Sequence, residues 1–164
     1  MYDKFKEYKF VNEDNSRTYR PVPSAGGRHP FETYLVINNV EGLDKGVYRY
    51  LSLTNELVFM FDDIDKLSKI DEYSFNQQFV AKGAVIFIWS CIPYRSEWEY
   101  YTVAHKAILL DAGHICQNLY LACESIGLGT CAIASYKQKE MDEFLNLSGE
   151  EEFVVYLAPV GKIR

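Results

Sequence analysis

A glycine-rich loop near the start of the chain carries the residue types most able to do chemistry. The segment 20–32 places a hydroxyl (Ser24), two adjacent glycines (Gly26 and Gly27) and an imidazole (His29) directly before an apolar run. Glycine permits positive φ and leaves the backbone uncovered, so such a loop can press its N–H groups against an anion or a flat ring system. An ordinary Gly/Pro turn before a strand has the same composition, and the segment alone leaves both interpretations open.

The other reactive side chains do not form a self-contained active site. His105 and His114 lie nine residues apart, not at the i, i+4 spacing of a zinc pair, and no metal site is predicted. Ser24 has no base near it in the sequence, and neither a Gly-x-Ser-x-Gly elbow nor a P-loop occurs. We expect Cys131 to be a packed strand cysteine rather than a catalytic thiol. The chemistry is therefore expected to come from a cofactor.

Length and composition predict one globular domain over residues 1–164, of which 1–16 are a polar N-terminal segment. The 48% hydrophobic content of the 164 residues is enough for a core. The formal net charge of -6 argues against a nucleic-acid partner. No apolar stretch is long enough to span a membrane, the N-terminus does not resemble a signal peptide, and the four cysteines read as buried free thiols. We expect a soluble cytoplasmic protein.

Hydrophobic periodicity predicts a mixture of helices and strands without strict alternation, which favours an α+β fold. The longest element is a helix over about 97–126, apolar on so many sides that it is either a core helix or one shared with a second subunit. The run 84–89 is typical of a central strand buried on both faces. The remaining predicted elements are strands at 32–38, 130–136 and 153–158, a hairpin over 46–60, a short helix capped by Asp63 and running through Ile70, and a charged helix over 137–147.

Four motifs in order resemble the FMN-dependent nitroreductase superfamily. Residues 23–32, followed by a strand, are similar to its Pro-Ser-Ala-Gly-Asn-x-Gln-Pro-Trp segment. Segments 42–50 and 110–119 resemble more specifically its azoline-dehydrogenase branch, whose members oxidise thiazoline and oxazoline rings in modified peptides. Residues 127–131 are similar to a helix-to-strand turn that both branches share. The resemblance runs from about residue 17 to the end, and it favours a flavin-contacting loop over a simple turn.

The resemblance implies a nitroreductase-like α+β fold: a central, mostly antiparallel sheet flanked by helices, in a homodimer built around the long helix. It also implies FMN at the subunit interface and ping-pong hydride transfer through flavin N5. The first expectation is NAD(P)H-dependent reduction of nitro or quinone compounds. One alternative is a peptide azoline dehydrogenase, and another is a shortened, catalytically silent flavin-binding or interaction module.

Carried over by position, the resemblance assigns three groups of cofactor contacts. They are a loop along the ring and ribityl chain, a segment with a backbone N–H near flavin N5, for which Ala134 is the expected donor, and cations for the phosphate. The groups are, in that order, Pro23, Ser24, Ala25, Gly27 and His29; Ala132, Ile133, Ala134 and Ser135; and Arg17, Arg20, Lys162 and Arg164.

The chain departs from the family pattern in two places. Full-length relatives open with an Arg-Arg-Ser-x-Arg motif that holds the FMN phosphate, and nothing in 1–16 matches it. Active azoline dehydrogenases carry a Lys-Tyr pair ahead of the long helix, where this chain has Glu99 and Tyr100. Tyr100 is thus the one catalytic candidate, and the absent lysine counts against azoline oxidation.

Overall fold

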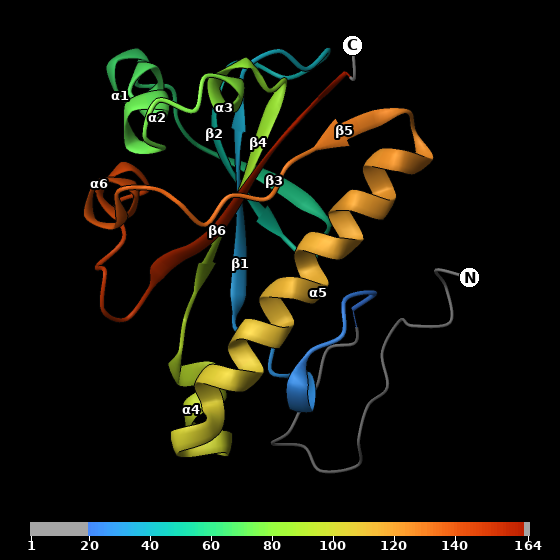
Figure 1. The fold of residues 1–164 in the computed structure, drawn as a ribbon, viewed down its shortest axis with the longest axis vertical. Coiled ribbons are helices and arrows are strands. Elements are labelled where there is room, and N and C mark those ends of the chain that lie inside the picture. The colour runs from blue at the N-terminus through green and yellow to red at the C-terminus, as the bar shows by residue number, and fades with distance from the viewer. Residues whose placement is uncertain (1–19, 163–164) are drawn as a thin grey trace.

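The computed structural model describes residues 20–162, and within that range the fold is organised by a six-stranded antiparallel sheet (Figure 1). The strand order is β3-β2-β1-β4-β6-β5. The strands are β1 (Phe31–Ile37), β2 (Gly46–Leu51), β3 (Glu56–Phe61), β4 (Val85–Cys91), β5 (Leu128–Thr130) and β6 (Phe153–Lys162). Strand β4 lies between β1 and β6, as expected for its apolar run, and the predicted α+β class is confirmed.

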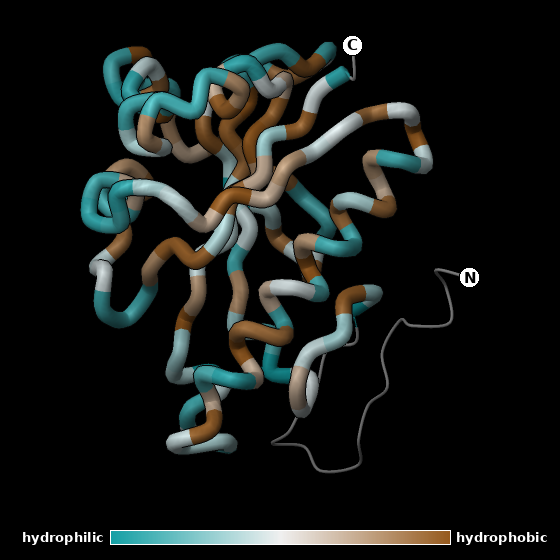
Figure 2. The backbone as a smooth tube through the Cα atoms, in the orientation of Figure 1, coloured by the Kyte–Doolittle hydropathy of each residue, from teal (hydrophilic) through white to brown (hydrophobic). Residues whose placement is uncertain are grey.

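Helices cover both faces of the sheet (Figure 1). The long helix α5 (Ala104–Ser125) packs on one face, where Ile108 and Cys116 meet Phe31 of β1. Four short helices cover part of the other face, where Val36 of β1 lies in the largest core cluster. They are α1 (Ile64–Ser68), α2 (Ile70–Tyr73), α3 (Phe79–Lys82) and α6 (Gln138–Phe144). Figure 2 shows the hydrophobic residues gathered along the strands between these layers.

The ends of two elements follow from identifiable contacts. Helix α1 begins after Asp63, whose Oδ1 accepts a hydrogen bond from the Lys66 N–H at 3.1 Å, so the predicted cap is confirmed. Strand β6 continues beyond the predicted end at 158 because its last residues pair with β5, down to Leu128 opposite Lys162.

Two predicted elements differ from the structure in continuity or length. The helix expected over 97–126 is divided into α4 (Tyr94–Tyr100), the 3₁₀ turn η3 (Tyr101–Val103) and α5. Tyr101 has a φ of 46°, a left-handed conformation that interrupts the α-helical hydrogen bonds. The strand expected over 130–136 ends at Thr130, and only Ile133 beyond it forms a bridge, to Leu157.

The cysteines correct one further expectation. Cys91, Cys116 and Cys123 are buried, but Cys131 is exposed, because the strand that would have packed it ends one residue earlier. Burial raises the pKa of Cys91 to about 12 and that of Cys116 to about 11, so these thiols stay protonated at neutral pH. None of the helices between residues 20 and 162 has the length and apolarity to cross a bilayer.

Candidate functional site

One buried carboxylate on α5 accepts hydrogen bonds from the glycine loop. Asp111, which is 2% exposed, accepts a hydrogen bond from Ser24 Oγ at 2.5 Å on Oδ2 and one from the Ala25 N–H at 3.0 Å on Oδ1. Ser24 Oγ in turn accepts the His29 N–H at 2.9 Å. The carboxylate is thus paired with two donors, and the loop from Ser24 to His29 is held in one conformation.

The two glycines of this loop have different surroundings. Both adopt left-handed backbone conformations, with φ of 58° at Gly26 and 65° at Gly27, within the 3₁₀ turn η2 (Ala25–Gly27). A Cβ on Gly26 would collide with the Tyr100 hydroxyl, whereas a Cβ on Gly27 would meet nothing within 4 Å. The backbone at Gly27 therefore borders open space, into which a flat ring could fit.

The residues at the family's Lys-Tyr positions lie against the same loop. Glu99 Oε2 forms an ion pair with Arg28 Nη2 at 2.6 Å, and the Arg28 guanidinium lies 3.9 Å from the centre of the Trp98 ring. The Tyr100 hydroxyl lies over Gly26. Glu99 thus fixes the loop through Arg28, and the catalytic candidate Tyr100 lies beside it.

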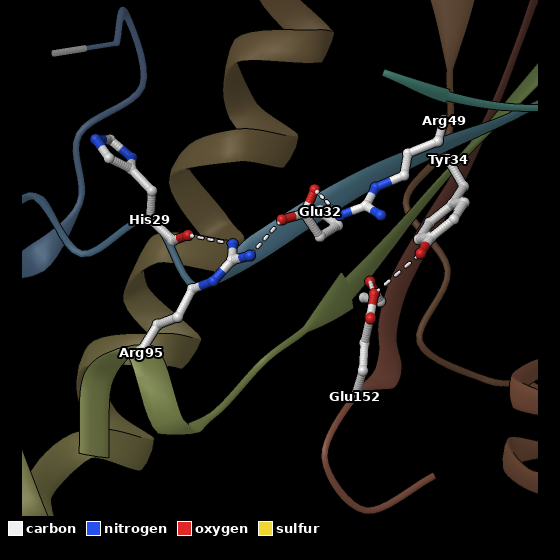
Figure 3. A network of polar contacts seen from close by, with 7 residues as sticks. His29, Glu32, Tyr34, Arg49, Arg95 and Glu152 are labelled. Atoms are coloured by element: carbon white, nitrogen blue, oxygen red, sulfur yellow. Dashed lines mark hydrogen bonds and ion pairs between the residues drawn. The ribbon is translucent and has the colours of Figure 1, made fainter. Parts of the chain in front are cut away.

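Where the loop enters β1, a polar network fixes the backbone (Figure 3). Glu32 accepts Arg95 Nη2 at 2.6 Å and Arg49 Nη2 at 3.0 Å, while Arg95 Nη1 donates to the His29 carbonyl at 3.2 Å. Burial alone would raise the pKa of Glu32, but its hydrogen bonds from Arg95 and Arg49 outweigh burial and hold that pKa below its usual range. The His29 imidazole points away from this network.

Next to it, Tyr34 and Glu152 form a second polar pair (Figure 3). Tyr34 Oη donates to Glu152 Oε1 at 3.1 Å. Burial of the Tyr34 phenol, together with the negative charge of Glu152, raises its pKa to about 12. Tyr34 therefore acts as a neutral hydrogen-bond donor at physiological pH.

Of the predicted phosphate cations, the two that the structure describes, Arg20 and Lys162, are not brought together. Arg20 is half-buried near Glu32 and Arg95, and burial lowers its pKa. Lys162 is exposed at the end of β6, paired with Leu128, at the opposite end of the sheet from Glu32. Arg17 and Arg164 lie outside the described residues.

In the segment predicted to face flavin N5, hydrogen bonds hold the backbone on both sides of Ala134. The Ala132 N–H donates to Tyr120 Oη at 2.9 Å, and Ile133 exchanges backbone hydrogen bonds of 2.8 and 3.1 Å with Leu157. The Ser135 carbonyl accepts Gln77 Nε2 at 3.0 Å. Ala134 is exposed, and its N–H has no partner among residues 20–162. The site therefore presents a backbone N–H outward from a fixed backbone.

The glycine loop and the segment 132–135 contact α5 at different positions along the helix axis. Asp111 and Tyr120, their respective anchors, are nine residues apart, or about 13 Å along a helix that rises 1.5 Å per residue. Within one chain, the loop and the segment are thus held by separate anchors on α5.

Sequence reasoning missed the anchors Asp111 and Tyr120 as site residues. Asp111 lies in the segment 110–119 that resembles the azoline-dehydrogenase branch, but it is not among the predicted cofactor contacts. An acidic residue between Ile108 and Ala112, on the apolar side of a long helix, is a signal that could have pointed to it, because a buried carboxylate needs partners. No comparable signal marks Tyr120.

The sequence matches a known protein family. The Nitroreductase family model matches residues 14–162. A Methanocaldococcus jannaschii protein that carries the name of a nitroreductase is 28% identical over 158 residues, which are 96% of this chain and 76% of the relative.

Solved structures show the same fold. A nitroreductase structure from Anabaena variabilis has a TM-score of 0.86 at 25% identity, covering 93% of this chain and 31% of its own. The Escherichia coli microcin synthetase McbBCD complex with truncated pro-MccB17 bound has a TM-score of 0.77 at 22% identity, covering 89% of this chain and 56% of its own. The chain therefore spans a third to just over half of these solved chains. The family expected from the motifs is thus confirmed, and the chain belongs to the nitroreductase family.

Proposed function

We propose that this chain is an FMN-dependent oxidoreductase that works as a homodimer. The observation that carries the proposal is the exposed N–H of Ala134, which has no partner among residues 20–162 and lies between the fixed residues Ile133 and Ser135. Such a donor can hydrogen-bond flavin N5 and support negative charge on a reduced ring. FMN, when bound, supplies the hydride chemistry, and the protein supplies binding and orientation.

In this proposal each flavin contacts two subunits. The loop 23–29 of one subunit, with its open face at Gly27, would lie along the ring and ribityl chain, while residues 132–135 of the other subunit would face N5. Lys162 would bind the phosphate, together with Arg17, Arg20 and Arg164 as further candidates. The separation of the two anchors along α5 supports a site completed by a second copy of the chain.

The outer side of α5 supports the dimer. Val103 directly precedes α5, Leu110 lies 7 residues after Val103, and Leu121 lies 11 residues after Leu110; this spacing places the three on one side of a helix. They are 57%, 56% and 61% exposed in the single chain. Exposed apolar residues in a row favour burial against another helix, and the second copy of α5 is the occupant that we propose.

For the substrate, we propose NAD(P)H-dependent reduction of nitro or quinone compounds. Oxidation of peptide azolines is the second candidate, and the observation in its favour is the Tyr100 hydroxyl beside the glycine loop, where it could transfer a proton. The ion pair of Glu99 with Arg28 weighs against it, since the family's lysine position is occupied by a carboxylate bound to the loop.

Flavin uptake tests the proposal. The purified protein titrated with FMN should show saturable quenching of flavin fluorescence, and NADH or NADPH should bleach the bound flavin under anaerobic conditions. Protein that takes up no FMN would contradict both enzyme candidates. Flavin that binds but is bleached by neither nucleotide would instead support the azoline candidate if a thiazoline peptide reduces it, and the silent module if that peptide also fails.

A matched pair of glycine variants tests the location of the site. Gly27 and Gly42 both have positive φ, 65° and 82°, and a Cβ at either would meet nothing within 4 Å. Gly27→Val and Gly42→Val should therefore carry similar backbone strain. Only Gly27→Val should abolish FMN binding. Equal FMN affinity in the two folded variants would show that the loop is only a turn.

A further inference from the structure

A groove of about 890 Å³ opens where α4, the start of α5 and the turn before β6 meet. Its apolar wall is formed by Ile92, Ile108, Phe153 and Val155, which are buried or half-buried. None of its lining residues belongs to the glycine loop or to the segment 132–135. The groove is therefore a feature separate from the proposed flavin site.

The edge of this groove is acidic. Glu97 on α4 lies on one side, and Glu150 and Glu151 on the turn before β6 lie on the other, while no lysine or arginine among residues 20–162 lines it. In the part of the chain that the structure describes, His105 and Tyr94 are the other titratable groups of its lining. Carboxylates on both sides of an apolar wall give the groove a negative field that favours a cation.

The turn that carries two of these carboxylates is rigid. Ser148 Oγ accepts the N–H groups of the three residues 150–152, at 3.3, 3.0 and 3.2 Å. The Gly149 N–H donates to the Glu152 carbonyl at 3.0 Å. Because the backbone is fixed in this way, Glu150 and Glu151 are positioned before any ligand arrives, which lowers the entropy cost of binding.

Two large side chains that line the groove are largely exposed to solvent. Tyr94 is 72% exposed and Leu109 is 64% exposed, and both line the groove. Together with the apolar wall they offer a surface for alkyl groups, and the carboxylates around them offer partners for charged ends.

We propose that this groove binds a short extended peptide segment in which lysine or arginine alternates with leucine-like residues. The basic side chains would pair with Glu97 on one side and with Glu150 and Glu151 on the other, and the apolar side chains would cover Leu109 and the wall. A single small amine would reach only one side of the groove, whereas a peptide can engage both sides and the apolar wall at once. The proposal does not depend on flavin binding.

The test is fluorescence anisotropy with a fluorescein-labelled peptide of alternating lysine and leucine. We expect saturable binding to the wild-type protein and no binding of a matched glutamate-leucine peptide. The double variant Glu150→Gln/Glu151→Gln should bind about tenfold more weakly. The control Glu41→Gln/Asp44→Asn makes the same change in net charge in the exposed turn between β1 and β2, and should bind as the wild type does.

Leu109→Ser separates the apolar contribution from charge. It should weaken binding several-fold while leaving the melting temperature nearly unchanged, because Leu109 is exposed. Equal weakening in both charge variants, or equally tight binding of an all-lysine peptide, would overturn the proposal, because either result would mean attraction by net charge alone. The absence of saturable binding in wild-type protein would overturn it as well.

Discussion

Ser24 donates its hydroxyl to Asp111 across 87 residues of sequence, at 2.5 Å. The same carboxylate accepts the Ala25 N–H, so one buried side chain of α5 sets the position of the loop that identifies the family. Long-range contacts therefore determine the conformation of the loop, and they come from α5, the helix on which the proposed dimer is built.

Replacing Asp111 with alanine should loosen the loop. Ser24 Oγ and the Ala25 N–H would both lose their acceptor, and a half-buried donor left unpaired costs about 1–3 kcal/mol of folding free energy. We expect FMN affinity to fall about tenfold in Asp111→Ala and less in Asp111→Asn, which keeps one acceptor oxygen. FMN titration and urea unfolding measure the two effects. Glu143→Ala on α6 should change neither, and unchanged FMN affinity in folded Asp111→Ala would exclude the anchoring role.

Tyr120→Phe tests the anchor of the other half of the site. The variant removes the oxygen that accepts the Ala132 N–H at 2.9 Å and leaves the ring in place. Since water can replace the lost acceptor at this exposed position, we expect a stability loss of about 1 kcal/mol or less. The rate at which NAD(P)H reduces bound flavin, measured by anaerobic stopped flow, should fall several-fold. Tyr94→Phe, far from the segment, should leave that rate as it is.

The Glu32 network predicts how stability depends on pH. The pKa of Glu32 is lower in the folded protein than in the unfolded chain, where it is about 4.3. Its ionised form therefore stabilises the fold fully above that pH, and this stabilisation is lost as the pH falls through the folded-state pKa. We expect Glu32→Gln to lower the free energy of unfolding by about 2 kcal/mol at pH 7.

The difference between wild type and Glu32→Gln should shrink as the pH is lowered from 5 to 3. Glu143→Gln is a suitable control, because its ion pair with Lys139, at 3.7 Å, is exposed and contributes at most about 0.5 kcal/mol. A difference that stayed constant over this pH range would mean that the ion pairs of Glu32 do not depress its pKa.

The local sequence pattern predicts most helices and strands, whereas the points at which they break depend on long-range contacts. The apolar run of β4 and the Asp63 cap follow from residues close together in sequence, and the structure contains both. The break at Tyr101 could not be predicted, because tyrosine has no preference for a φ of 46° and only the surrounding packing enforces it.

The candidate site shows the same division between local pattern and long-range contacts. The glycine loop was recognisable because its function needs small residues in a fixed order. Its anchors were not, because Asp111 and Arg95 come from elements that meet the loop only in the folded chain. The apolar pattern after Gly129 predicts a strand that would bury Cys131, but the strand ends at Thr130, and the Ala132 N–H donates to Tyr120 Oη instead of to a neighbouring strand.

Subunit complementation tests the central claim, that the flavin site is shared between two copies of the chain. Gly27→Val should remove the loop half of the site, and Ala134→Pro should remove the N–H of the other half without breaking a hydrogen bond to residues 20–162. Neither variant alone should bind FMN. Each mixed dimer would have one site with both defects and one intact site.

Refolding the two variants together in equal amounts and measuring bound FMN by its visible absorbance is the direct measurement. If halves from different subunits form each site, random pairing makes half of the dimers mixed, and FMN uptake should recover to about a quarter of the wild-type value. If one chain contained the whole site, no mixture could restore it, and uptake would stay as low as in either variant alone.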